Sequence, residues 1–182
     1  MAIILLNKLL PLDSPKRIGI MYPKYITIHE TELGEELSPN TYCYEYYQKK
    51  LLDNSSSIGY HFMVEANHNE PSRIYQFLET SVSTHHCGHS EGNSKSLGIE
   101  RLVNVDTDME RAIDVQAKLT ALLMLNFNIP IENIKTHNYW NPKKLCPNRL
   151  LVNKYGSWNS FINKIQFYLD NKDKIENLKF SK

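Results

Sequence analysis

YITIHE, residues 25–30, is the segment of the sequence from which the fold can be predicted. Its polar side chains Thr27 and His29 share one face, and two isoleucines share the other. This period of two is typical of a strand near the centre of a sheet. The polar segment ETELGEEL follows the strand, and a loop at that position can open a cleft over His29.

Four further segments have the length and apolar content of strands, and they are residues 1–12 (a first strand or an arm), 59–64, 73–78 and 97–103. In the second of these segments, Tyr60, Phe62 and Val64 are predicted to share a face. In the last, the alternation places the carboxylate of Glu100 on an otherwise apolar side.

Three helices are predicted from capping residues and apolar periodicity, and they begin at Ser38-Pro39, at Thr107-Asp-Met-Glu110 (a capping box) and at Ser157. Strands and helices interleave without a strict βαβ rhythm. This order predicts a single α/β domain in which α-helices flank a central mixed β-sheet. We expect the domain to cover residues 1–172 and the Lys-rich residues 173–182 to form a C-terminal tail.

The bulk composition limits the possible functions. The chain has 182 residues, of which 41% are hydrophobic and 23% charged, as expected for one globular domain. A net charge of +1 without a basic block argues against nucleic acid as a partner, and no apolar run is long enough to cross a membrane. The N-terminal segment lacks a basic leader and a cleavage site, so we expect cytoplasmic synthesis without a signal peptide. Three cysteines favour free or metal-bound thiols over a disulfide framework, and nothing specifies an oligomeric state.

Residues 134–151, IKTHNYWNPKKLCPNRLL, hold His137 and Cys146 nine positions apart (146 − 137). Histidine and cysteine are good zinc ligands, and a loop of this length can bring both to one ion. His29 is the candidate third ligand. Three protein ligands with an open fourth position are the pattern of a catalytic zinc site, although His29 alone is more simply explained as a strand-end histidine that binds a backbone carbonyl.

Two alternatives use other residues or another chemistry. His85-His86-Cys87-x-His89 is a rival ligand cluster, but adjacent residues of an extended chain point to opposite faces, so we expect these side chains to line a groove. Cys146 could also be a thiol nucleophile with His137 as its base. The proline after Cys146 and the absence of a predicted helix N-terminus there disfavour that mechanism.

Four motifs, ITIHET, GYHFMV, SLGIERLV and H-x-x-W…K-x-CPNRLL, occur in this order along the chain. Together they resemble the zinc N-acetylmuramoyl-L-alanine amidases of phage endolysins and bacterial autolysins, whose fold is shared with peptidoglycan-recognition proteins and lysozyme-type phage amidases. The resemblance extends from about Tyr25 to the last predicted helix. Each motif is weak by itself, and the series of four is specific.

The resemblance implies a role for seven residues, which are His29, His137 and Cys146 as zinc ligands, Glu100, Lys144 and Tyr60 as catalytic residues, and His86 as a substrate-binding residue. Glu100 would transfer a proton from water to the leaving amine, which contributes roughly 10²–10⁴ in rate. Lys144 or Tyr60 would stabilise the developing oxyanion. Without the resemblance, Glu100 would be interpreted as a buried acid paired with Arg73 or Arg101, and Lys144 as an exposed loop lysine.

One spacing departs from the family pattern. The interval from His137 to Cys146 is one residue longer than expected, so counting back from the cysteine selects Lys144 and counting forward from the histidine selects Lys143. We favour Lys144, because the K-x-C-P unit is local and Pro142 marks a turn that can absorb an extra residue.

The function implied is zinc-dependent hydrolysis of the amide bond between N-acetylmuramic acid and L-alanine in peptidoglycan. A protein made in the cytoplasm without a signal peptide would be a phage or prophage endolysin that another protein releases to the cell wall. The alternative is a peptidoglycan-binding or inhibitory module that keeps the fold without turnover.

Overall fold

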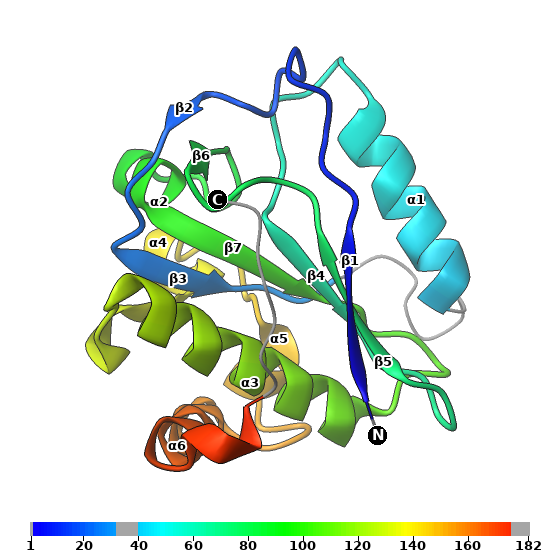
Figure 1. Cartoon of the computed structure of the whole chain (residues 1–182), viewed down its shortest axis with the longest axis vertical. Helices are drawn as coiled ribbons and strands as arrows, with labels where there is room; N and C mark the ends of the chain where they lie inside the picture. Colours follow the sequence, from blue (N-terminus) through cyan, green and yellow to red (C-terminus); the bar gives the residue numbers. More distant parts are fainter. Residues whose placement is uncertain (1, 32–39, 176–182) are drawn as a thin grey trace.

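The computed structural model describes residues 2–31 and 40–175 of the chain, without the side chains of residues 40–43. Figure 1 shows the strands gathered at the centre with helices on either side of them. The strands are β1 (Ile3–Asn7), β2 (Gly19–Ile20), β3 (Tyr25–Ile28), β4 (Phe62–Glu65), β5 (Ser72–Gln76), β6 (Val82–Ser83), β7 (Ser96–Arg101) and β8 (Ile134–Thr136).

The main sheet has six strands in the order β1-β5-β4-β7-β3-β8. β4 and β5 are antiparallel, and the other neighbouring strands are parallel. The predicted mixed sheet is therefore confirmed, as is a strand inside it at the start of residues 25–30, although β3 ends at Ile28 and not at residue 30. β2 and β6 form a separate antiparallel pair.

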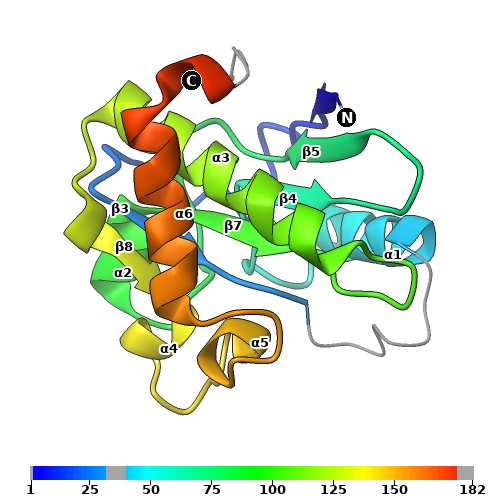
Figure 2. The same ribbon diagram turned by 90° about the horizontal axis from the view of Figure 1, so that it is seen from below.

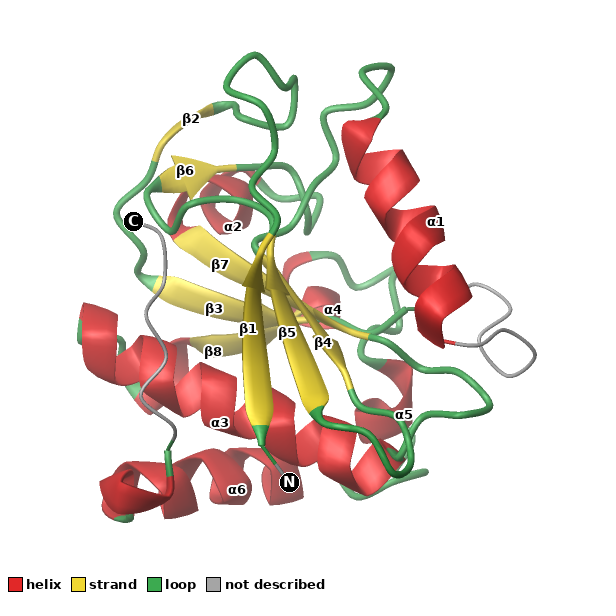
Figure 3. Ribbon diagram, turned by 45° about the vertical axis from the view of Figure 1, so that its right-hand side comes forward, coloured by secondary structure: helices red, strands yellow, loops and turns green. Residues whose placement is uncertain are grey.

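The helices are α1 (Asn40–Leu52), α2 (Ser90–Lys95), α3 (Met109–Phe127), α4 (His137–Trp140), α5 (Asn148–Leu151) and α6 (Trp158–Asp170), with short 3₁₀ turns η1 (Ile131–Asn133) and η2 (Lys172–Lys174). The sheet lies between α1 on one side and the pair of α3 and α6 on the other (Figure 3). Seen from below, α6 crosses the outer side of α3 (Figure 2), so α3 is enclosed between the sheet and α6.

Two clusters of buried side chains correspond to the two faces of the sheet. The isoleucines Ile26 and Ile28 of β3 pack with the apolar face of α3 and with Phe161 of α6. On the other side, Leu51 of α1 packs in a second cluster that contains Tyr60. Because Ile26 and Ile28 fill the first cluster, the alternate side chains of β3, including His29, point to the opposite face of the sheet.

Two local predictions are wrong. Tyr60 does not share a face with Phe62 and Val64, since those two residues pack under α3 while Tyr60 belongs to the second cluster. The reason is that β4 begins at Phe62, so its alternation does not extend back to Tyr60. The N-cap of α3 is Asp108 and not Thr107, because the Asp108 carboxylate accepts the N–H of residue 111.

Some of the remaining predictions fall on residues that the structure does not describe. The predicted helix start at Ser38-Pro39 and residues 176–182 of the predicted tail lie outside the described residues. The predicted cap at Ser157 is confirmed, since its hydroxyl accepts the N–H of Ser160. The sequence alone does not predict β2, β6, β8, α2, α4 or α5. None of the helices that the structure describes is long and apolar enough to span a membrane.

Candidate metal centre

The register of β3 against β8 brings the two predicted histidine ligands together. Ile28 of β3 pairs with Thr136 of β8 in a parallel ladder. The next residue of each chain is a histidine, so His29 and His137 leave adjacent strands at the same edge of the sheet. Trp140 fixes this arrangement, because its indole N–H donates to the Thr27 hydroxyl at 2.9 Å.

Cys146 joins the two histidines because the segment after α4 folds back on itself. The Asn138 N–H donates to the Cys146 carbonyl at 3.0 Å. The Asn138 side-chain amide donates to the carbonyl of Lys144 at 2.9 Å, and the Cys146 N–H donates to the same carbonyl at 2.9 Å. These bonds close the loop between the second histidine and the cysteine.

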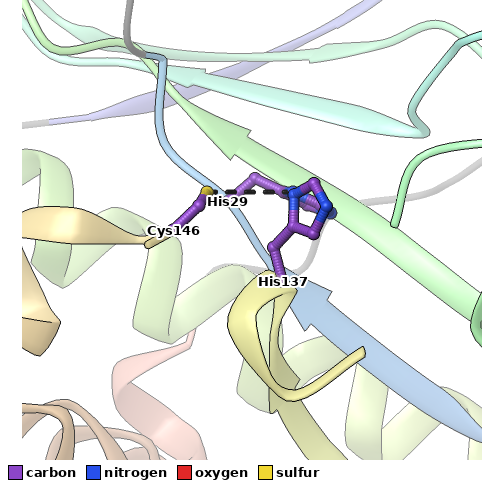
Figure 4. Close-up of side chains that lie close together, drawn as sticks. All are labelled: His29, His137 and Cys146. Atoms are coloured by element: carbon purple, nitrogen blue, oxygen red, sulfur yellow. Dashed lines mark hydrogen bonds between the residues drawn. The ribbon is translucent and has the colours of Figure 1, made fainter. Parts of the chain in front are cut away.

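The three donor atoms face one another (Figure 4). His29 Nδ1 lies 3.1 Å from His137 Nδ1 and 4.0 Å from Cys146 Sγ, and the ligand atoms of all three residues lie within 4.8 Å of one another. For a tetrahedral ion with ordinary zinc–nitrogen and zinc–sulfur bonds, these separations would be about 3.3 Å and about 3.6 Å. The donors therefore fit one metal ion, and the predicted convergence of His29, His137 and Cys146 is confirmed.

Burial keeps the histidines of the site neutral. His29 is 2% exposed, and burial, followed by the repulsion that protonated His86 and His137 would exert, lowers its pKa well below the ordinary value of 6.5. Burial and the positive charge of Lys144 also lower the pKa of His137. A neutral imidazole offers the lone pair that a metal requires.

A cavity of about 740 Å³ opens over the three donors. Glu100 and Lys144 line it, while Lys143 is not among the residues around it. Glu100 reaches this position because Ile28 of β3 pairs with Ile99 of β7, so the following residues, His29 and Glu100, lie side by side. The structure thus assembles six of the seven predicted residues around one cavity, all except Tyr60, and of the two candidate lysines it places Lys144 among the lining residues.

Tyr60 lies outside the residues that line the cavity, and the two arginines considered as partners of Glu100 bind other residues. Tyr60 is 6% exposed and does not line the cavity, and burial, followed by the charge of Glu100, raises its pKa well above the ordinary value. Arg73 binds Glu65 at 2.9 Å, and Arg101 binds a carboxylate on the opposite face of the sheet. The two arginines considered as partners of Glu100 therefore bind other carboxylates, Arg73 that of Glu65 and Arg101 that of Glu30.

His86 lines the cavity, and its ring is bonded at both nitrogens. Nδ1 lies 3.0 Å from His29 Nε2, and Nε2 lies 3.1 Å from the carbonyl oxygen of Ser96. Burial, followed by the charge of His61, lowers the pKa of His86 to about 3. The substrate contact that the resemblance implies for His86 stays a prediction.

The rival cluster at residues 85–89 does not converge. His85 is exposed and bonds the Ser57 hydroxyl, whereas the ring of His89 stacks on Trp140. Cys87 is buried and its thiol lies 3.3 Å from Asn93 Oδ1. Within residues 2–31 and 44–175, His29, His137 and Cys146 are the group suited to a metal, and the three histidines of 85–89 line the cavity as predicted.

A buried ion cluster behind the donors was not predicted. The Glu30 carboxylate binds the Arg101 guanidinium, accepts the backbone N–H of Arg149 at 2.8 Å and lies 3.4 Å from the Arg149 guanidinium. The Gln116 amide, which accepts from Arg101, donates to the His29 carbonyl at 3.0 Å. This cluster connects the end of β3, where His29 lies, to α5, which follows Cys146. Nothing local signals it, because the Glu30 carboxylate lies 71 positions from Arg101 and 119 positions from Arg149 in sequence.

Known proteins are similar to this chain both in sequence and in fold. Residues 20–149 match the family model Amidase_2, described as N-acetylmuramoyl-L-alanine amidase. N-acetylmuramoyl-L-alanine amidase CwlH of Bacillus subtilis (strain 168) is 33% identical over 160 residues, which are 86% of this chain and 58% of CwlH. N-acetylmuramoyl-L-alanine amidase XlyA of the same organism is 30% identical over 163 residues, which are 86% of this chain and 49% of XlyA.

The solved structures agree with these matches. The catalytic domain of XlyA superposes with a TM-score of 0.74 and 30% identity, covering 88% of this chain and 98% of that domain. A mutant endolysin from Bacillus subtilis superposes with a TM-score of 0.75 and 31% identity, covering 91% of this chain and 99% of that one. This chain spans about half the length of the curated relatives. The α/β fold and the resemblance drawn from the four motifs are confirmed, and the chain belongs to the Amidase_2 family of N-acetylmuramoyl-L-alanine amidases.

Proposed function

We propose that this chain is a zinc-dependent amidase that hydrolyses the bond between the lactyl group of N-acetylmuramic acid and the L-alanine of the peptidoglycan stem peptide. The observation that carries the proposal is the group of three metal donors at a cavity that Glu100 and Lys144 also line. Membership of the amidase family supports the muramyl–alanine amide as the bond that is cut.

His29, His137 and Cys146 would hold the zinc ion. Two imidazoles and a thiolate are ligand types that zinc accepts, and three protein ligands leave a position for water or substrate. When bound, zinc supplies water activated at neutral pH and a Lewis acid for the substrate carbonyl. The buried surroundings of His29 and Cys146, which are 2% and 4% exposed, hold both donors in place before the metal arrives.

Glu100 would carry the proton in this reaction. Glu100 follows the residue of β7 that pairs with Ile28, and it lines the cavity, where its carboxylate can accept a proton from the attacking water and return it to the leaving amine. The rigid sheet supports this role, since a base on a strand has less freedom than one on a loop.

Lys144 would stabilise the negative charge that develops on the carbonyl oxygen. Its ammonium lies close enough to His137 to lower the pKa of that imidazole, so its positive field reaches the metal donors. We assign the oxyanion contact to Lys144 and not to Tyr60, because Tyr60 is buried outside the residues that line the cavity. Tyr60 would act on Glu100, whose charge raises the pKa of the tyrosine.

Peptidoglycan would occupy the cavity above these groups. A cavity of about 740 Å³ lies in the range that small-molecule sites commonly have. His89 and Tyr47 form part of its wall and offer aromatic rings to a glycopeptide. A cell-wall lytic role of the endolysin type follows from this substrate and is supported by the similarity to an endolysin structure.

The decisive experiment measures cleavage of purified cell walls. We expect turbidity to fall and new L-alanine amino termini to appear, and both effects should stop when a chelator removes the metal. Addition of zinc should restore them. Glu100→Gln and Cys146→Ser should each abolish release of amino termini while the protein still binds walls.

Other outcomes support other functions. Intact walls with tight binding by the zinc-loaded wild type would favour a non-catalytic peptidoglycan-binding module. Release of amino termini that survives chelation and stops on thiol alkylation would favour a cysteine peptidase. New reducing sugars in place of amino termini would show that a glycosidic bond is cut and that the proposed bond is wrong.

A further inference from the structure

A line of hydrogen bonds begins at the ring nitrogen of His29 that does not face the other two metal donors. It begins at His29 Nε2, passes to His86 Nδ1 at 3.0 Å, and continues from His86 Nε2 to the Ser96 carbonyl oxygen at 3.1 Å. His29 and His86 are 57 positions apart in sequence, so only the fold creates this line. It ends on a backbone atom at the start of β7, which is part of the rigid sheet.

The chemistry of the last atom fixes the hydrogens along the whole line. A carbonyl oxygen can only accept, so His86 Nε2 must carry its hydrogen. His86 Nδ1 is then an acceptor, and His29 Nε2 must donate to it. The remaining nitrogen, His29 Nδ1, keeps its lone pair and points toward His137 Nδ1 at 3.1 Å and Cys146 Sγ at 4.0 Å.

We propose that His86 is a positioning residue which sets the tautomer and the ring angle of His29 so that Nδ1 is presented to the metal. This inference rests on the proposed function, since it assigns the metal donors named there. Partners of this kind orient metal-binding histidines and raise their basicity, and their loss typically lowers metal affinity about 10- to 100-fold. Both ring nitrogens of His86 are occupied in this line, so we assign the ring to His29 and not to a polar contact with substrate.

The surroundings of His86 hold the ring in this position. A Cβ at position 98 would lie 3.0 Å from His86 Nδ1 and 3.1 Å from its Cγ, so the glycine of the SLGIE motif provides the space for the imidazole. Asn93 anchors the backbone, because its Oδ1 accepts the N–H groups of His86 at 2.9 Å and of Cys87 at 3.0 Å. The ring of His61 packs edge-on against His86, with 6.2 Å between centroids, and its own Nδ1 accepts the Gly98 N–H.

Zinc affinity provides a test that does not depend on turnover. The dissociation constant of the purified chain for zinc would be measured by competition with a chromogenic chelator, for the wild type, His86→Gln and His86→Phe. We expect His86→Phe, which has no acceptor for His29, to bind zinc about 10- to 100-fold more weakly. His86→Gln can still accept a hydrogen bond and should recover part of the affinity.

His85→Phe is the matched control. His85 lines the same cavity, but its ring bonds the Ser57 hydroxyl at 2.8 Å and not a metal donor, so zinc affinity should be unchanged. In assays on walls at saturating zinc, loss of positioning should lower kcat with little change in KM. A raised KM with unchanged zinc affinity and kcat would show that His86 binds substrate and would refute the proposal.

Nitrogen NMR of the wild type tests the same inference without any substitution. In the zinc-loaded chain we expect hydrogens on Nε2 of both His29 and His86. A hydrogen on Nδ1 of either ring, or zinc affinity retained within about twofold in His86→Phe, would overturn the assignment. Zinc binding that depends on His86 in a chain that cleaves no walls would leave this inference standing and refute the proposed function instead.

Discussion

Glu30→Gln should destabilise the protein far more than an ordinary change of surface charge. The Glu30 carboxylate is fully buried and stands between two guanidiniums, those of Arg101, whose side chain is 0% exposed, and Arg149, whose side chain is 9% exposed. Glutamine keeps the volume of the side chain and removes its charge. Two buried positive charges would then remain without their anion.

The magnitude follows from this burial. Removal of one partner from a buried ion pair costs about 3–5 kcal/mol, because the other charge remains desolvated. Stabilities of native domains are commonly about 5–15 kcal/mol, so this is a large share of the total. For a chain of this length, with roughly 2–4 °C per kcal/mol, the thermal midpoint should fall by roughly 6–20 °C.

Urea unfolding followed by circular dichroism would measure the free energy of unfolding, with chelator present so that metal binding does not contribute. Glu70→Gln is the control, because Glu70 also pairs with an arginine, at 3.1 Å, but its side chain is 49% exposed. That change should cost less than about 1 kcal/mol. Equal, small losses for both variants would refute the argument, because they would show that Arg101 and Arg149 are compensated without Glu30.

Four further results are expected. Lys144→Ala should lower the rate of release of amino termini from walls about 10²–10³-fold, and Lys143→Ala should leave it within about twofold, since Lys144 alone of the two lines the cavity; the reverse result would select Lys143. Trp140→Phe removes the 2.9 Å bond to the Thr27 hydroxyl and should lower the free energy of unfolding by about 1 kcal/mol in urea, and an unchanged midpoint would show that this bond does not contribute. Zinc at 100 times its dissociation constant should raise the free energy of unfolding by about 2.7 kcal/mol, as measured by thermal and urea unfolding, and a chelator should reverse the effect. Burial lowers the pKa of His61 to about 4, against 6.5 in the unfolded chain, so the unfolded state binds the proton first and the free energy of unfolding should fall by about 3 kcal/mol from this residue as the pH drops from 6.5 to 4. Urea midpoints across that pH range should vary less in His61→Gln than in the wild type, and an equal pH dependence would contradict this assignment.

Much of the local structure could be predicted because its signals lie within a few residues. Alternation in YITIHE predicts a strand inside the sheet, and Ser157 predicts the start of the last helix, since its hydroxyl accepts the N–H of the residue three positions on. Prediction failed where an element was short or where two signals competed. β8 has three residues, too few for a period, and at the start of α3 the carboxylate of Asp108 caps the helix in place of the neighbouring threonine.

The candidate site divides in the same way. The choice of residue types at 29, 100, 137, 144 and 146 is visible in the sequence, because ligand chemistry belongs to individual side chains and K-x-C-P is a local motif. The partners of those residues are not visible. Glu30 with its arginines and His86 with Ser96 have no pattern that links them along the chain, because a buried charge or ring can be satisfied by any group that the fold brings near.

The sequence by itself therefore determined the α/β class, the metal-binding residue types and the family to which the chain belongs, since each depends on composition, periodicity or short motifs. Only the tertiary structure decided that His29 and His137 leave neighbouring strands, that Lys144 and not Lys143 lines the cavity, and that Tyr60 lies outside it. The physical reason is that strand register and loop closure depend on contacts between distant segments. A shift of one residue in that register would turn the ligands to the opposite face of the sheet.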